Sequence, residues 1–182
     1  SGYEMSQVFL DMLLYNYEWT GDLSMMKAIL PRLHRVIEAE NRLYDSDNDF
    51  LYTNKLNYFI TDAHWFYGGP CPEASAYMYR AFRALAAVLK KLKRPCTAYE
   101  ERREGIRKAM NGVLWLQRKG HFAQYKDVLG LQRIHEEAEL SAIYHPIEFG
   151  VTDMFQSYQQ LRYVETHMDS CRWGDGLIYW SS

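Results

Sequence analysis

Hydrophobic residues recur along most of the chain with the spacing of amphipathic helices. The first such segment runs from about Glu4 to Trp19 and has little polar face, which predicts a helix buried nearly all round. The second runs from about residue 22 to Leu43 and carries one apolar stripe, which predicts a single buried face. Because Pro31 lies inside this second segment, we expect a kink or a new segment there. The two patterns indicate an inner and an outer layer of helices.

Four further helices are predicted, over about residues 73–93, 97–116, 137–144 and 152–168. The third helix is apolar on a wide arc, whereas the fourth and sixth each have one apolar face. In the sixth helix that face consists of Met154, Phe155, Tyr158, Leu161 and Val164. Residues 121–125 and 131–135 flank Gly130 with the shorter period of strands. The pattern therefore predicts an all-α fold of antiparallel helical hairpins, with a small β-hairpin near 121–135, in a single domain over residues 1–182.

The connections between these helices alternate in length. Three predicted connections are short, at residues 19–22, 94–97 and 145–152, and three long segments cover residues 44–72, 117–136 and 169–182. In an antiparallel array every second connection lies at the same end, so the long segments are expected to share one face. Long loops in compact domains usually carry function. Candidate functional residues are therefore expected on that face.

Composition narrows the classes of partner. The chain has 182 residues, 48% hydrophobic and 24% charged, which is typical of a globular domain. A net charge of −2 gives no basic footprint for nucleic acid, and no apolar run is long enough to span a membrane. Three distant cysteines form neither a disulfide framework nor a zinc motif, and no phosphate-binding or dinucleotide fingerprint is present, so we expect no metal and no cofactor.

Aromatic residues are abundant at 15% of the chain, with 15 Tyr, 8 Phe and 5 Trp. Such side chains fill cores or form clefts that stack on flat ligands such as sugars. An Asp-x-Asp-x-Asp run at residues 45–49 suggests calcium, but Phe50 and Leu56 replace the Gly and Glu that a calcium loop needs at its sixth and twelfth positions. A solvated turn is the preferred interpretation of this run.

Several short motifs, in order, resemble the six-hairpin glycosidases, the (α/α)6-barrel family that includes α-L-rhamnosidases, trehalases and α-glucosidases. The resemblance rests on residues 17–22 (YEWTGD), 45–51 (DSDNDFL) and 62–65 (DAHW), followed by a Gly-rich loop and a long Ala/Tyr-rich helix. It implies that the six predicted helices form about half of a twelve-helix toroid, completed by further hairpins of a parent chain. It also implies hydrolysis of glycosidic bonds in an oligo- or polysaccharide, and a periplasmic or extracellular location.

Hydrolysis of a glycosidic bond needs two carboxyl groups, one of them kept protonated by an apolar setting. Asp62 is the first candidate because neighbouring aromatic residues would raise its pKa by desolvation. Glu137, after the predicted hairpin, is the second, although the helix dipole alone favours an acidic residue in a first turn; Glu73 at the start of the third helix has the same explanation. Residues expected to bind substrate are Glu4, His64, Trp65, Tyr67, Glu139 and Trp173.

Two other functions remain open. A non-catalytic carbohydrate-binding or scaffold domain would keep the fold and the aromatic cleft without an acid–base pair. A sugar epimerase or polysaccharide lyase would place different chemistry on the same toroid. If neighbouring hairpins are missing, the first and third helices are left exposed, and the isolated chain is expected to self-associate.

Overall fold

The computed structural model of the chain describes residues 4–53, 57–59, 63–65, 68–172 and 178–180. These residues form six α-helices and one π-helical segment: α1 (Glu4–Thr20), α2 (Leu23–Tyr44), α3 (Pro72–Lys91), α4 (Thr97–Ala109), η1 (Met110–Leu114), α5 (Leu140–Glu148) and α6 (Met154–His167). The fold is mostly α-helical, as the hydrophobic pattern predicted.

Four short antiparallel hairpins join the helices within the described residues. Their strand pairs are β1 (Asn57–Phe59) with β2 (Ala63–Trp65), β3 (Trp115–Leu116) with β4 (His121–Phe122), β5 (Tyr125–Lys126) with β6 (Ile134–His135), and β7 (Ser170–Arg172) with β8 (Ile178–Trp180). The small hairpin expected near 121–135 is present as β5–β6, and a further hairpin, β3–β4, precedes it. Residues 121–122 pair with the preceding strand, so that Trp115 lies opposite Phe122. Within 121–135, Tyr125–Lys126 pairs with Ile134–His135.

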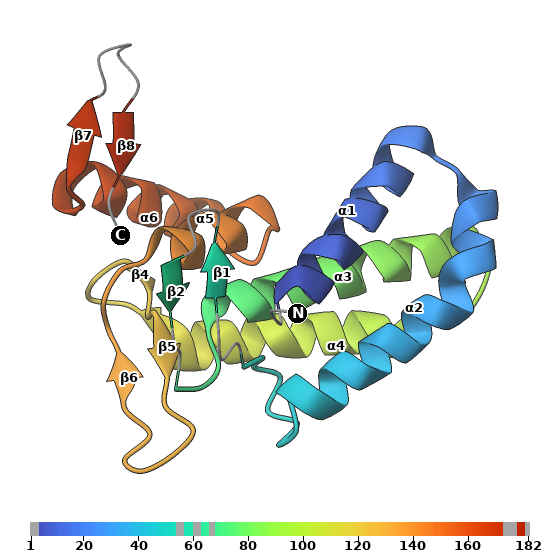
Figure 1. Cartoon of the computed structure of the whole chain (residues 1–182), viewed down its shortest axis with the longest axis horizontal. Coiled ribbons are helices and arrows are strands. Elements are labelled where there is room, and N and C mark those ends of the chain that lie inside the picture. Colours follow the sequence, from blue (N-terminus) through green and yellow to red (C-terminus); the bar gives the residue numbers. More distant parts are fainter. Residues whose placement is uncertain (1–3, 54–56, 60–62, 66–67, 173–177, 181–182) are drawn as a thin grey trace.

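Helix α3 lies at the centre of the array and packs against α1, α4 and α5 (Figure 1). Its buried positions go almost all the way round, as the wide apolar arc predicted. Alanines at 74, 76, 81, 84 and 86 are all buried, and their small side chains let the neighbouring helix backbones approach closely. Proline at the first position of α3 starts the helix without losing a hydrogen bond.

Helices at the two ends of the array expose apolar side chains. The first helix was expected to be buried all round, but Phe9 is 67% exposed and Met12 is also exposed, because α1 packs on α3 from one side only. The predicted apolar face of the sixth helix is likewise mostly open: Met154 is 89% exposed, and within that face only Val164 is buried. Both expectations of burial were wrong because each helix has a packing partner on one side only.

Two predicted boundaries also change. Helix α5 starts at Leu140 with Glu139 as its N-cap residue, so Glu137 lies in the preceding loop instead of in the helix. Helix α2 continues as one element through Pro31. Figure 1 shows the α1–α2 and α3–α4 connections on the right of the view and the strand-bearing segments on the left, which matches the separation of short and long connections expected from their lengths.

Candidate functional site

Two glutamates meet where α3 and α5 begin. Glu73 lies in the first turn of α3 and is 2% exposed, and Glu139 precedes the first turn of α5 and is 8% exposed. Helices α3 and α5 pack against each other, which brings residues 66 positions apart in the sequence into one cluster. Two acidic side chains buried so completely need a specific environment, because desolvation penalises a carboxylate strongly.

Ser141 joins the two carboxyl groups. Its Oγ atom donates a hydrogen bond to Oε1 of Glu139 at 2.8 Å, and it also hydrogen-bonds to the side chain of Glu73. The pKa of Glu73 is raised from 4.5 to about 8; burial is the largest cause, the nearby charge of Glu139 contributes to the rise, and the bond to Ser141 opposes it. At neutral pH, Glu73 is therefore a protonated acid that lies near a second carboxyl group.

A histidine lies beside Glu73, and three aromatic rings contact that histidine. Nε2 of His145, on α5, lies 3.6 Å from Oε1 of Glu73. The ring of His145 contacts Tyr77 at 4.7 Å and stacks on Phe149 at 5.2 Å between centroids. Tyr144 approaches the same histidine at 4.1 Å. Glu73 is itself 2% exposed, and this burial accounts physically for its raised pKa.

The polar line continues along α3. Glu73, Tyr77 and Arg80 follow the i, i+4, i+7 spacing of one helix face. Arg80, which is buried, pairs with Asp11 of α1, and its Nη2 lies 3.0 Å from Oε2 of Glu18. Burial raises the pKa of Asp11, whereas its hydrogen bond with Arg80 lowers it.

The Tyr15 hydroxyl of α1 donates to Oε1 of Glu148 on α5 at 2.9 Å. The guanidinium of Arg80 lies 4.1 Å from the centre of the Tyr15 ring. Charged and aromatic groups from α1, α3 and α5 thus line one continuous polar seam between these helices. The arrangement offers a protonated acid at one end of the seam and a fixed cation further along it.

The structure assigns different surroundings to the residues expected to form the site. Glu139 is in the buried cluster, whereas Glu137 is exposed in the loop after β6. Asp62, Tyr67 and Trp173 lie outside the described residues. The backbones of Glu4, His64 and Trp65 are placed in α1 and β2, but their side chains lie outside the described part of the structure.

Sequence reasoning missed Ser141 and His145, and it explained Glu73 by the helix dipole alone. The spacing Glu139–Ser141–His145 holds one signal that could have revealed them. A serine two residues after a helix-starting glutamate can hydrogen-bond to it locally, and a histidine four residues further along lies one turn up the helix. Nothing in the local sequence, however, indicates that Glu73 meets this face.

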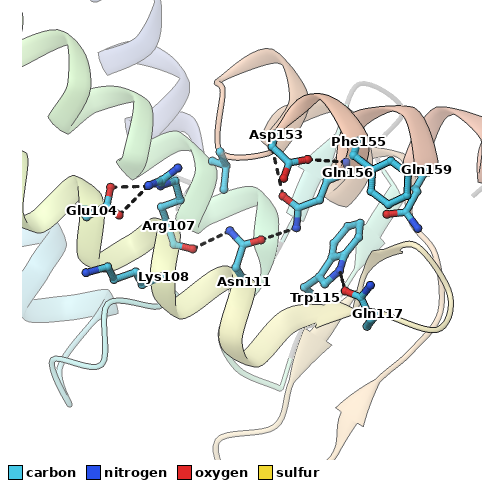
Figure 2. A pocket seen from close by; sticks show the side chains of 11 residues that line it. Glu104, Arg107, Lys108, Asn111, Trp115, Gln117, Asp153, Phe155, Gln156 and Gln159 are labelled. Atoms are coloured by element: carbon cyan, nitrogen blue, oxygen red, sulfur yellow. Dashed lines mark hydrogen bonds and ion pairs between the residues drawn. The ribbon is translucent and has the colours of Figure 1, made fainter.

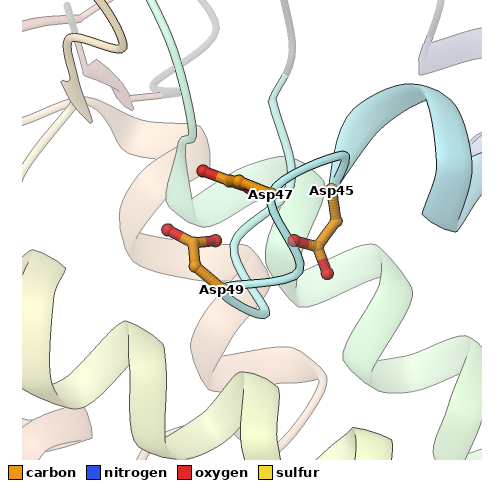
Figure 3. A group of neighbouring side chains, drawn as sticks. All are labelled: Asp45, Asp47 and Asp49. Atoms are coloured by element: carbon orange, nitrogen blue, oxygen red, sulfur yellow. The ribbon is translucent and has the colours of Figure 1, made fainter.

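The acidic run at residues 45–49 folds into a tight turn after α2. Figure 3 shows Asp45, Asp47 and Asp49 around this turn, and one carboxylate oxygen from each lies within 4.8 Å of the others. Arg102 of α4 pairs with Asp45, and its Nη1 donates to Oδ1 of Asn48 at 2.5 Å. Burial raises the pKa of Asp45 to about 6 against the opposing charge of Arg102. A guanidinium thus already holds the one buried carboxylate of the run.

Among the described residues, no helix combines the length and the apolar character needed to cross a membrane.

Comparison with known proteins finds likeness at the level of structure. No family model matches the sequence, and no curated protein matches it. The chain is similar to the crystal structure of a GH78 family rhamnosidase of Bacillus sp. GL1, with a TM-score of 0.70, 13% identity and 88% of this chain covered. It is also similar to a rhamnosidase from Klebsiella oxytoca with rhamnose bound, with a TM-score of 0.64 and the same identity and coverage of this chain.

The chain spans only 17% and 30% of the lengths of these two rhamnosidase chains. At 13% identity the likeness concerns the fold alone. The helical array of this chain thus has a glycoside hydrolase-like fold.

Proposed function

We propose that this chain is a carbohydrate-active domain that hydrolyses a glycosidic bond, with Glu73 and Glu139 as its acid–base pair. The observation that carries the proposal is the meeting of these two carboxyl groups around Ser141, one of them held protonated at neutral pH. Glycosidases need such a pair, a carboxylic acid and a carboxylate whose environments differ. The glycoside hydrolase-like fold supports the same conclusion.

In the proposed mechanism the two glutamates have separate tasks. Glu73 donates its proton to the glycosidic oxygen as the bond from that oxygen to the anomeric carbon breaks, which gives the leaving sugar its hydroxyl group. Glu139 supplies the carboxylate that accepts a proton from a water molecule, whose oxygen bonds to the anomeric carbon and becomes the hydroxyl group of the second sugar. The hydrogen bond from Ser141 orients the carboxyl group of Glu139. His145 acts as a positioning residue that holds the Glu73 carboxyl group from its other side.

Asp62 and Glu137 remain proposals from the sequence. Glu137 is exposed two residues before Glu139, so it is suited to the rim of a substrate cleft and less suited to the part of a protonated acid. Asp62 keeps its proposed part as an acid or ligand of the substrate on the long-loop face. His64, Trp65, Tyr67 and Trp173 are proposed as sugar contacts on that face.

We further propose that the array is part of an (α/α)6 toroid. Three observations support this: α3 packs against both α1 and α5, the rhamnosidases it resembles are much longer chains, and α1 exposes Phe9 and Met12. Further helical hairpins would cover this face of α1. Without them, we expect the isolated chain to associate with itself.

The test is hydrolysis of 4-nitrophenyl glycosides, with α-L-rhamnopyranoside included in the panel. Wild-type protein is compared with Glu73→Gln, Glu139→Gln, Asp62→Asn and Glu137→Gln, each checked for folding by circular dichroism. Loss of at least about 100-fold in kcat for the first two, with Glu137→Gln near wild type, supports the proposed pair. Wild-type turnover in Glu73→Gln would contradict it, and unchanged turnover in Asp62→Asn would remove Asp62 from the catalytic group.

A non-catalytic carbohydrate-binding domain is the second candidate. It is favoured by the enclosure of Glu73 and Glu139, whose buried carboxyl groups leave little surface for a substrate to reach. In that case the pair stabilises the contact between α3 and α5. One result separates this candidate from the hydrolase: the wild-type protein binds sugar but hydrolyses no glycoside in the panel.

A further inference from the structure

A cleft of about 470 Å³ lies between the end of α4 and the beginning of α6 (Figure 2). Its size falls within the range of about 300–1,000 Å³ that is typical of ligand sites. None of its lining residues belongs to the Glu73–Glu139 cluster. We propose that this cleft is a second, separate binding site that takes a segment of a neutral oligosaccharide.

The floor of the cleft is held by a chain of hydrogen bonds between the two helices. Nε2 of Gln156, on α6, donates to Oδ1 of Asn111 at 2.5 Å, and Asn111 in turn donates to the backbone carbonyl of Arg107 at 2.8 Å. Gln156 and Asp153 form a capping box, in which the backbone amide of each donates to the side chain of the other at 2.7 and 3.2 Å. The floor is therefore fixed before any ligand arrives, which lowers the entropic cost of binding.

A π-helical turn lies at this point of the chain. Segment η1, Met110–Leu114, directly follows α4 and carries Asn111 into the floor. Turns of this kind are rare and occur frequently at functional sites, because the extra residue interrupts the regular hydrogen-bond ladder. A π-helical turn lowers the stability of a helix, and a role in shaping a binding site explains why such a turn is kept. Here the turn also ends the helix and directs the chain into Trp115.

Two aromatic side chains line the cleft, Phe155 from α6 and Trp115 from the strand that follows η1 (Figure 2). Phe155 is 65% exposed, so core packing does not explain it. Trp115 is half-buried against Phe122, and its Nε1 donates to Oε1 of Gln117 at 2.9 Å, which fixes the orientation of the indole. Flat rings held at a polar cleft offer apolar faces on which the C–H face of a sugar ring can stack.

The polar lining combines four amides with four charged side chains, which carry no net charge because two are acidic (Glu104 and Asp153) and two are basic (Arg107 and Lys108). Asn111, Gln117, Gln156 and Gln159 each carry a donor and an acceptor, which matches the hydroxyl groups of a sugar. Arg107 is held by both oxygens of Glu104, at 3.2 and 2.8 Å, so its charge is largely neutralised. Such a lining favours a neutral polyhydroxyl ligand over a polyanion, which would need several unpaired cations.

A second hollow of about 200 Å³ continues along α6 from Gln159, which lines both. Tyr158 and Tyr163 line this hollow, and Gly120 forms part of its wall. Gly120 has a φ of +74°, a left-handed conformation that favours glycine. Two neighbouring hollows along one helix favour a chain of sugars over a single one.

This inference goes beyond the proposed hydrolysis and does not depend on it. The first measurement is binding of the full chain to an array of neutral tetrasaccharides of glucose, galactose, mannose and rhamnose, with uronate-containing tetrasaccharides alongside. The tetrasaccharide that binds most strongly is then titrated by calorimetry. We expect a neutral tetrasaccharide to bind, and Phe155→Ala to weaken its affinity by about tenfold or more.

Two further variants make the outcome decisive. Gln156→Ala, which breaks the floor, is also expected to weaken binding, whereas Phe9→Ala, which removes an equally exposed aromatic ring from α1, should leave the affinity unchanged. Three results would overturn the proposal. The protein binds no neutral tetrasaccharide, it binds only those that contain uronate, or both cleft variants bind with wild-type affinity. The two proposals can fail separately. If the protein hydrolyses no glycoside but loses tetrasaccharide binding in Phe155→Ala, this site is supported and the proposed hydrolysis is contradicted.

Discussion

Nε2 of His145 lies 3.6 Å from Oε1 of Glu73, and both side chains are almost completely buried. Since the pKa of Glu73 is about 8, its carboxyl group is protonated at pH 7 and meets the imidazole as a neutral acid. A buried neutral acid beside an imidazole costs far less than a buried lone carboxylate. The contact therefore links the packing of α3 on α5 to the ionisation of one glutamate.

The first prediction concerns pH and stability. The pKa of Glu73 is raised from 4.5 to about 8 on folding, so between these values the folded state binds more protons than the unfolded state. Its contribution to the free energy of unfolding is fully present below about pH 4.5 and is lost as the pH rises through 8. Glu73→Gln should remove this part of the decline.

Urea unfolding between pH 4.5 and 9 checks this expectation. The matched control is Glu137→Gln, an exposed glutamate whose removal should leave the pH dependence as in the wild type. Equal slopes of stability against pH in Glu73→Gln and wild type would contradict the assignment of the buried acid.

The second prediction concerns the ion pair between α1 and α3. Replacing Arg80 with Met keeps much of the apolar volume but leaves Asp11 without its cation, so we expect a loss of about 3–5 kcal/mol in the free energy of unfolding. Arg107→Met removes an exposed pair with Glu104 and should cost about 0–1 kcal/mol. Denaturant melts of both variants make the comparison, and similar losses in the two would show that the Arg80 pair is not the stronger contact.

The third prediction compares the effect on stability of replacing glycine with alanine at two positions. A β-carbon at Gly105, on α4, would lie 2.5 Å from Cδ1 of Phe50, whereas at Gly112 there is nothing within 4 Å. Gly105→Ala should therefore destabilise the fold by about 1–3 kcal/mol through overpacking. Gly112→Ala should stabilise it by about 0.4–1 kcal/mol, because alanine loses less backbone entropy on folding. Thermal unfolding measures both signs, and a gain at Gly105 would contradict the close packing of Phe50 on α4.

The fourth prediction concerns the start of α6. Asp153 accepts from the backbone amide of Gln156 at 2.7 Å, so Asp153→Ala should cost about 1 kcal/mol of stability. Glu165→Ala, on the exposed side of the same helix, should change stability by less than about 0.5 kcal/mol. Differential scanning calorimetry of the two variants tests the difference, and equal melting temperatures would argue against the capping box.

Much of the helical layout could be predicted from the sequence. Three residues favour the start of a helix: Asp22, Pro72 and Asp153. Helices α2, α3 and α6 begin within about two residues of them. The fifth helix was misplaced because a run of glutamates fits a first helical turn as well as it fits a loop. The β-hairpin was placed in the right segment, but its pairing could not be predicted because strands of two residues carry too few side chains to fix it.

The site followed the sequence less closely. Glu139 was expected to bind substrate and is buried beside Glu73, whereas Glu73 was explained by its place at the start of a helix. The helix-dipole explanation applies to a buried and to an exposed Glu73 alike, because an acidic residue in a first turn is favourable in either setting. The raised pKa of Glu73 comes from α5 packing over it, which no feature of residues 72–76 encodes.

The sequence alone determined the helical class, the alternation of broadly and narrowly apolar helices and the grouping of the long segments, because these depend on periodicity and on the length of the chain between elements. The tertiary structure alone decided which acidic residues are buried together, which apolar faces stay open and where a cleft forms. Burial and ionisation depend on neighbours that are distant in the sequence. Glu73 becomes a neutral acid only when α3 and α5 pack together and exclude water from it.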